Sequence, residues 1–203
     1  HTDLEYCETY SEDAYNTNTE SVKTAVEISN SLSIPLLFIS TAGIFSGTSD
    51  FFDENDTPNP VGHYGRSKYL AERHVIENAN DYLICRAGWM MGGGPQKDKK
   101  FIAKIIKQIV NGQKELFVVN DKDGTPTYTI DFSKNVNHLI QNNKRGLYNM
   151  VCSGMTSRLD VAHKVLDILE LKDVIKITPV NSNYFSHSYF AQRPPNERLI
   201  NKR

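Results

Sequence analysis

Short, continuous apolar runs alternate with segments of helical periodicity along this chain, and that alternation limits the possible folds more than any other feature. The runs are "PLLFIS" at 35–40, "DYLICRA" at 81–87 and "ELFVVND" at 115–121. Strands that are buried on both faces of a parallel sheet have this unbroken apolar character. Strands of this kind, separated by helices, indicate an α/β fold with a mostly parallel sheet.

The rest of the pattern supports the same fold class. We expect helices over about 3–32, from about 63, from about 101, and over about 129–142 and 156–169, with short strands near 146–151 and 174–179. A glycine-rich stretch at 92–96 is a weak boundary. Beyond it, the shorter strands and loops predict a small lobe that binds substrate.

Composition excludes several classes of partner. The net charge of the 203 residues is -1, and no basic run is long enough to attract DNA or RNA. No apolar run approaches the length of a membrane span. Cys7, Cys85 and Cys152 form no CxxC pair, so neither a zinc site nor a disulfide framework is indicated. We therefore expect a reducing, cytoplasmic location.

Tyr64 and Lys68 are the most suggestive pair of residues. Four residues apart on a helix, they share one face, with Cβ atoms about 5–6 Å apart. A phenol beside an ammonium is either an ordinary surface pair or an acid whose pKa is drawn toward neutrality. In parallel sheets, ligands bind beyond the carboxyl ends of the strands. We expect residues 40–42, the start of the Tyr64 helix and residues 86–89 to face one such crevice.

The chemistry of that crevice fits carbonyl reduction. A ketone that accepts a hydride needs a proton on its oxygen, and a tyrosine with a pKa of about 10 is poorly matched at neutral pH unless a cation favours the phenolate. Lys68 would supply the cation, and Thr41 would bind the same oxygen. A matched proton donor contributes about 10²–10⁴-fold in rate. The group is therefore a candidate reduction site if a hydride carrier lies opposite.

The order of the motifs resembles a known family. "FISTAGIF", followed 23 residues after Thr41 by "YGRSK", resembles the Ser/Thr…Tyr-x-x-x-Lys signature of the extended short-chain dehydrogenase/reductase superfamily. Within it the sequence is most similar to the dTDP-4-dehydrorhamnose reductase family, through "HTDLEYCE", "FDENDTPNPVGHYGRSK", "RAGWMMGGG", "VVNDKDGTPTYTIDF" and "RPPNERLIN". YxxxK alone recurs by chance, whereas five motifs in order, over nearly the whole chain, are specific.

This resemblance implies a fold and an activity. The fold would be a partial Rossmann-like, doubly wound parallel sheet with a small C-terminal substrate lobe. Residues 1–91 would form the C-terminal part of the NAD(P)-binding domain, and residues 92–203 would combine the substrate lobe with elements that return to the sheet. The activity would be reduction of a nucleotide-linked 4-keto-6-deoxy sugar by NADPH or NADH, in deoxysugar or polysaccharide synthesis. The resemblance is also compatible with a homodimer.

The same resemblance assigns roles to individual residues. Tyr64 would donate the proton, Lys68 would lower its pKa and bind the nicotinamide ribose, and Thr41 would bind the substrate oxygen. The residues implied at NADP or NAD are His1, Thr2, Ser40, Tyr64, Lys68 and Gly88, and those implied at the nucleotide sugar are Thr41, Ala42, Trp89 and Arg193. No metal site is implied, and we expect the loop carboxylates Asp53, Glu54 and Asp56 to be solvated. Trp89 as a packing aromatic and Arg193 as a structural residue are the competing interpretations.

Two departures from the family pattern affect these expectations. The family's first four strands, with the glycine-rich turn that seats a pyrophosphate, would precede His1. We therefore expect this chain to be a piece of a longer protein and to bind a dinucleotide poorly by itself. The family's "STDYVF" reads "STAGIF" here, so Gly43 replaces an aromatic residue that helps to hold the sugar.

Two other functions are compatible with the sequence. One is a non-catalytic regulatory or binding protein on the same fold, such as the regulatory subunit of methionine adenosyltransferase. Gly43 and the absent nucleotide-binding half favour it, and the intact set of Thr41, Tyr64 and Lys68 opposes it. The other is a sugar-nucleotide epimerase or dehydratase. A dehydratase usually needs additional acid and base residues after Thr41, and "STAGIF" has none.

Overall fold

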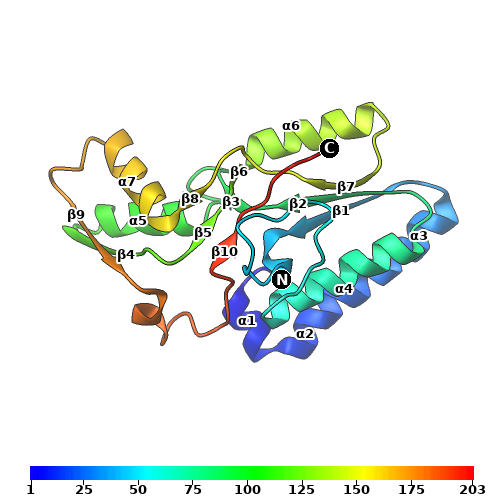
Figure 1. The fold of residues 1–203 in the computed structure, drawn as a ribbon, viewed down its shortest axis with the longest axis horizontal. Helices are drawn as coiled ribbons and strands as arrows, with labels where there is room; N and C mark the ends of the chain where they lie inside the picture. The colour runs from blue at the N-terminus through cyan, green and yellow to red at the C-terminus, as the bar shows by residue number, and fades with distance from the viewer.

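A parallel three-stranded sheet forms the centre of the computed structural model, which describes residues 1–203. Its strands are β1 (Leu36–Thr41), β2 (Tyr82–Ala87) and β7 (Gly146–Asn149), in the order β1-β2-β7. Helices α3 (Ser21–Leu32) and α4 (His63–Asn78) cover one face, and α6 (Thr129–Gln141) covers the other (Figure 1). The α/β fold with a mostly parallel sheet is confirmed.

Each face of the sheet has its own apolar core. On the α3–α4 face, the core consists of Val26, Phe38, Ala71, Val75, Ile84 and Leu147. On the α6 face, it consists of Leu83, Cys85, Ala87, Phe132 and Val136. Alternate residues of β2 therefore enter opposite cores, as the period of a strand requires.

Burial on both faces is confirmed for β2, whereas one face of β1 is exposed in this 203-residue chain. In β1, Phe38 is buried, but Leu37 and Ile39 are 40% and 46% exposed. β1 lies at the edge of the sheet, and none of its residues belongs to the core that α6 forms with β2. The apolar run of β1 therefore predicted a strand, but it did not predict how many faces would be covered.

The helical segment predicted at 3–32 is divided into pieces. They are α1 (Leu4–Thr9), α2 (Ser11–Tyr15), a π-helical turn (Asn16–Glu20) and α3. The turn buries Asn18 and Thr19 against α4, where Thr19 Oγ1 donates to the carbonyl of Ser67 at 2.8 Å. Such π turns often lie at functional sites, and this one lies against the helix that carries Tyr64 and Lys68.

A second lobe packs around its own small sheet. Strands β4 (Glu115–Val119) and β9 (Lys176–Val180) pair in parallel. Helices α5 (Phe101–Val110) and α7 (Arg158–Ile168) lie beside them, at the left of Figure 1. The buried side chains of this lobe are Ile105, Leu116, Val118, Ala162, Leu166 and Ile175.

Very short strands that the sequence pattern did not predict connect the two lobes. They are β3 (Trp89–Met91) with β6 (Pro126–Tyr128), and β5 (Asp123–Gly124) between β8 (Thr156–Ser157) and β10 (Asn196–Glu197). Short 3-10 turns follow β1 (Ala42–Ile44) and β9 (Ser182–Phe185).

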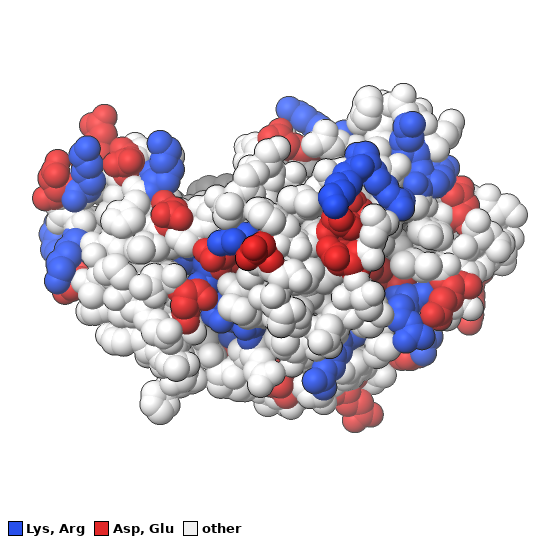
Figure 2. Space-filling view, viewed as in Figure 1, with Lys and Arg blue, Asp and Glu red and all other residues white.

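The face of the molecule drawn in Figure 2 has no patch of a single charge sign. Lysines and arginines are interspersed with aspartates and glutamates over the face drawn in Figure 2. None of the helices combines the length and the apolar character that crossing a membrane requires.

Candidate active site

Thr41 and Tyr64 meet at the carboxyl end of β1. Thr41 is the last residue of the strand, and Tyr64 is the second residue of α4. The Cβ position of Gly43, where a side chain would begin, lies 3.5 Å from Thr41 Oγ1 and 3.6 Å from Tyr64 Cε1. Thr41 Oγ1 accepts the backbone N–H of Gly43 at 3.1 Å. The hydroxyl hydrogen of Thr41 therefore remains available for another acceptor.

Lys68 lies on the same helix but points to the strand. Its Nζ donates to the carbonyl oxygen of Ile39 at 2.8 Å and lies 4.2 Å from the centre of the Phe38 ring. Burial lowers the pKa of Lys68 to about 8, and the charge of Glu72 acts in the opposite direction. One of the three ammonium donors is thus bonded to the protein backbone.

The predicted effect of Lys68 on Tyr64 is wrong in this structure. Burial raises the pKa of Tyr64 to about 12, and the charges of Glu197 and Cys7 add to the rise. A hydrogen bond with Thr41 is the only influence that lowers this pKa. The physical reason is geometric: the ammonium of Lys68 bonds to a β1 carbonyl, and the phenol loses more solvation than its neighbours replace.

Ser40 and Lys68, two of the residues expected at the dinucleotide, have hydrogen-bonding groups that suit it. Ser40 is buried and its Oγ has no hydrogen-bond partner. Asn18 Nδ2 donates both to the His1 carbonyl at 3.0 Å and to Ser67 Oγ at 3.1 Å, so His1 and the adjoining Thr2 start beside α4. An unpaired buried hydroxyl and an ammonium with free donors suit the hydroxyls of a ribose. Their contact with a cofactor stays a prediction.

Gly88 has a structural explanation. A Cβ at this position would collide with the carbonyl oxygen of Thr125, and the Gly88 N–H donates to Thr127 Oγ1 at 3.0 Å. The glycine is therefore required by the close approach of its own chain. Its proposed place near the nicotinamide is not tested by this contact.

Two of the predicted substrate residues are engaged elsewhere. Ala42 is 1% exposed and packs with Ile44 and Phe45, so its side chain cannot contact a sugar, because the 3-10 turn directs it into the core. Arg193 pairs with Glu5 at 2.8 Å and donates to the Ala191 carbonyl at 2.9 Å. These contacts support the structural interpretation of Arg193 rather than the diphosphate contact.

Arg86 also fails to face the crevice. It is buried and forms an ion pair with buried Glu72 of α4, with an N–O distance of 2.6 Å. Its guanidinium lies 5.1 Å from the centre of the Phe45 ring. The pair connects β2 to the helix that carries Tyr64, which is a structural role.

The loop carboxylates are not all solvated. Glu54 is buried, and its oxygens accept the backbone N–H groups of Asn149 at 2.9 Å and Lys202 at 3.2 Å. Asp53 pairs with the Lys202 ammonium. The expectation of a solvated loop is therefore wrong for Glu54, because the C-terminal segment folds back over it.

Sequence reasoning missed two charged residues around Trp89. The Trp89 Nε1–H donates to Glu197 Oε2 at 2.7 Å, and the Arg158 guanidinium lies 3.8 Å from the centre of the Trp89 ring. Trp89 itself is 7% exposed, so much of its ring serves packing, and its direct contact with a sugar stays a prediction. Glu197 lies in the "RPPNERLIN" motif and Arg158 at the start of a predicted helix, but neither position by itself indicates a contact with Trp89.

Arg158 is a half-buried cation without an ion-pair partner. It is the first residue of α7, whose N-terminus is closed by a capping box between Ser157 and Asp160. Burial lowers the pKa of Arg158 to about 10, with Glu197 opposing the shift. A cation is unfavourable at a helix N-terminus. Stacking on Trp89 and Phe101 offsets this and leaves the guanidinium donors available.

Comparison with known proteins shows the family of the chain. The sequence matches the family described as RmlD substrate binding domain over residues 1–203. It is 30% identical over 207 residues to dTDP-4-dehydrorhamnose reductase of Salmonella typhimurium, covering 98% of this chain and 68% of the relative.

Solved structures show the same fold. A dTDP-4-dehydrorhamnose reductase from Yersinia enterocolitica superposes with a TM-score of 0.92 at 34% identity, over 98% of this chain and 69% of that one. The enzyme from Bacillus anthracis, in complex with NADP, gives 0.91 at 28% identity, over 100% and 69%. The Rossmann-like fold is thereby confirmed. The chain belongs to the dTDP-4-dehydrorhamnose reductase family of extended short-chain dehydrogenases/reductases.

Proposed function

We propose that the protein reduces the 4-keto group of a dTDP-linked 4-keto-6-deoxy sugar, with NADPH or NADH as the hydride donor. The observation that carries the proposal is the meeting of Thr41 and Tyr64 at the carboxyl end of β1. Its place agrees with the general position of ligands in parallel α/β sheets. The family membership selects this reaction among those that such a site can perform.

In this proposal Thr41 and Tyr64 bind the substrate carbonyl oxygen together. The hydroxyl of Thr41 accepts from Gly43, so its hydrogen, which can also bond to the Tyr64 oxygen, would donate to the carbonyl. With a pKa of about 12, Tyr64 remains protonated at neutral pH and keeps its proton for the oxygen. Bound NAD(P)H supplies the hydride. As negative charge builds on the oxygen, it becomes more basic than the phenolate, and Tyr64 transfers its proton.

Lys68, Ser40, His1 and Thr2 would hold the cofactor beside that carbonyl. The ammonium of Lys68 has two donors that the Ile39 carbonyl does not use, and the buried Ser40 hydroxyl has no partner. We assign both to ribose hydroxyls. Residues 1–91 would therefore contribute the cofactor side of the site.

The second lobe, within residues 92–203, would bind the nucleotide part of the substrate. Arg158 supplies a stacked guanidinium without an ion-pair partner. A planar guanidinium binds phosphate oxygens in a bidentate manner. We therefore assign the diphosphate to Arg158 in place of Arg193, whose charge is paired with Glu5.

The test is turnover of a dTDP-4-keto-6-deoxy sugar by the full-length protein, as its complete reading frame encodes it. Tyr64→Phe is expected to lower kcat by about 10²–10⁴-fold, the usual contribution of a positioned proton donor. Tyr184→Phe, on an exposed tyrosine, serves as the matched control. Equal turnover by Tyr64→Phe and wild type would exclude the mechanism.

Two further measurements separate the other functions. NADPH binding without turnover, together with capture of a partner from the native source, would favour a regulatory protein. Product analysis would reveal an epimerase or dehydratase. The homodimer stays a prediction, which light scattering at defined protein concentration would test.

A further inference from the structure

The carboxylate of Glu197 lies close to Thr41 and Tyr64. Its Oε1 is 3.6 Å from the Cβ position of Gly43, a point that also has Thr41 Oγ1 and Tyr64 Cε1 within 4 Å. Glu197 is separated from Thr41 by most of the chain, yet its charge contributes to the raised pKa of Tyr64. Three polar side chains therefore surround one small space, and Gly43 keeps that space open.

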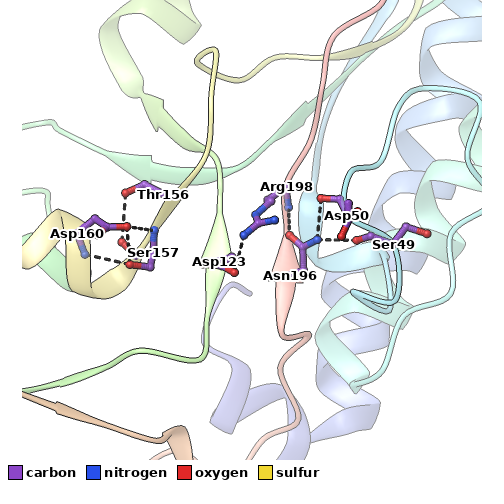
Figure 3. Close-up of polar contacts among 8 residues, drawn as sticks. All are labelled: Ser49, Asp50, Asp123, Thr156, Ser157, Asp160, Asn196 and Arg198. Carbon is purple, nitrogen blue, oxygen red and sulfur yellow. Dashed lines mark hydrogen bonds and ion pairs between the residues drawn. The ribbon is translucent and has the colours of Figure 1, made fainter.

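Strand β10 fixes the position of Glu197. On one side, Asn196 Nδ2 donates to the carbonyls of Ser49 at 2.5 Å and Asp50 at 2.9 Å. On the other side, Arg198 pairs with Asp123 at 2.6 Å (Figure 3). These contacts on both sequence neighbours hold the backbone of Glu197 in place. A carboxylate on a segment held in this way is preorganised.

Only one of the two Glu197 oxygens has a partner. Oε2 accepts the Trp89 Nε1–H at 2.7 Å, and Glu197 forms no ion pair. Arg158 stacks on Trp89 without bonding to the carboxylate. Oε1 therefore faces the space beside Gly43 as an acceptor with no donor of its own.

The three groups have complementary hydrogen-bonding roles. Thr41 and Tyr64 offer hydroxyl donors, whereas an ionised carboxylate can only accept. A carbonyl oxygen would be attracted by the two hydroxyls and repelled by Glu197. A hydroxyl on the adjacent carbon would donate to Glu197. The set matches an α-hydroxyketone, in which a carbonyl and a hydroxyl stand on neighbouring carbons.

We propose that Glu197 Oε1 accepts a hydrogen bond from the sugar hydroxyl next to the keto carbon, and so selects α-hydroxyketone sugars over deoxygenated ones. This inference rests on the proposed function, since it takes the carbonyl to lie at Thr41 and Tyr64. A site built to bond a substrate hydroxyl rejects an analogue without it, because the polar group of the site is left unpaired. Glu197 is thus a specificity-determining residue.

The test compares substrates with and without that hydroxyl. For the full-length wild type, kcat/KM for the dTDP-4-keto-6-deoxy sugar should exceed that for its 3-deoxy counterpart by about 10²-fold or more. In Glu197→Gln, which keeps the size of the side chain and an acceptor for Trp89, the preference should fall by at least about tenfold. Glu27→Gln, on an exposed glutamate of α3, should keep the wild-type preference.

Trp89→Phe separates this role from a structural one. It removes the N–H that holds Oε2 and retains the carboxylate. If Glu197 served only to hold Trp89, Glu197→Gln would keep the full preference for the hydroxyl, and the proposal would be overturned. Circular dichroism of each variant establishes that it is folded.

A binding arm distinguishes failure of this inference from failure of the proposed function. The dissociation constants of dTDP-glucose, its 3-deoxy analogue and dTDP are measured by calorimetry. Glu197→Gln should weaken the binding of dTDP-glucose by about tenfold and leave the binding of dTDP unchanged. Turnover by wild type with an unchanged preference in Glu197→Gln overturns the inference alone. If the sugar binds in a Glu197-dependent manner but wild type shows no turnover, the proposed reductase activity alone is overturned. If none of the three ligands binds, both the proposed function and this inference are overturned.

Discussion

Lys68 Nζ donates a hydrogen bond to the carbonyl oxygen of Ile39, 2.8 Å away, and so connects α4 to β1. The two residues flank the pair that the site depends on, since Thr41 ends β1 and Tyr64 lies one turn before Lys68 on α4. The contact holds the phenol and the threonine hydroxyl at the same end of the sheet. Lys68 therefore links the helix of Tyr64 to the strand of Thr41, while burial raises the pKa of Tyr64.

The first prediction concerns stability and pH. The folded-state pKa of Lys68, about 8, lies below its ordinary value of 10.5. Between these values the unfolded chain holds a proton that the folded chain lacks, so this residue makes stability rise with pH. Between about pH 7.5 and about pH 10, the free energy of unfolding measured by urea titration should rise more for wild type than for Lys68→Met. Lys164→Met, at an exposed site, should follow wild type at both pH values.

The second prediction concerns the hydroxyl of Thr41. Thr41→Val should lower kcat by about 10²-fold, as removal of a donor to a developing oxyanion does. Thr41→Ser, which keeps the hydroxyl, should restore most of the rate. Steady-state kinetics on the full-length protein would measure both, and a Thr41→Val variant with wild-type kcat would remove Thr41 from the mechanism.

The third prediction concerns Arg158 and the diphosphate. Arg158→Met should weaken the binding of dTDP by about tenfold or more, because one charge-assisted phosphate contact is lost. Thymidine, which has no phosphate, should bind both forms equally. Isothermal titration with the two ligands makes this comparison. The assignment fails if dTDP affinity is unchanged or if thymidine affinity falls in parallel.

The fourth prediction concerns the buried pair of Glu72 and Arg86. Arg86→Met leaves a buried carboxylate uncompensated and should cost about 3–5 kcal/mol of unfolding free energy. Replacing both residues by apolar ones, as Glu72→Leu with Arg86→Met, should recover much of that loss. Denaturant unfolding of the single and double variants would measure the coupling. Additive losses would show that the ion pair does not act as a unit.

The regular elements could be predicted because their signals are local. The apolar run of β2 and the helical periodicity of α6 lie within single segments, and the structure has both elements within a few residues of the predicted bounds, whereas α3 matches the helix predicted at 3–32 only at its end. The covering of β1 was not predictable in this way. It depends on where α6 packs, which is set by contacts with Leu83, Cys85 and Ala87 rather than by β1 itself.

The candidate site was predictable only in part. Thr41 and Tyr64 follow from the strand end and the helix start, which the sequence marks. The direction of the Lys68 side chain does not follow, since a long, flexible chain can reach either the phenol or a strand carbonyl from the same position. Glu197 and Arg158 depend on β10 and β8, strands of two residues that have no periodicity to detect.

The uncovered side of β1 has a consequence for handling this 203-residue chain by itself. Leu37 and Ile39 are exposed there, on a strand paired along one side only. An open apolar edge of this kind is a template on which other chains can add strands, which is how many proteins aggregate. A charged substitution at Leu37 should therefore keep concentrated solutions of this chain clear for longer than the native sequence does.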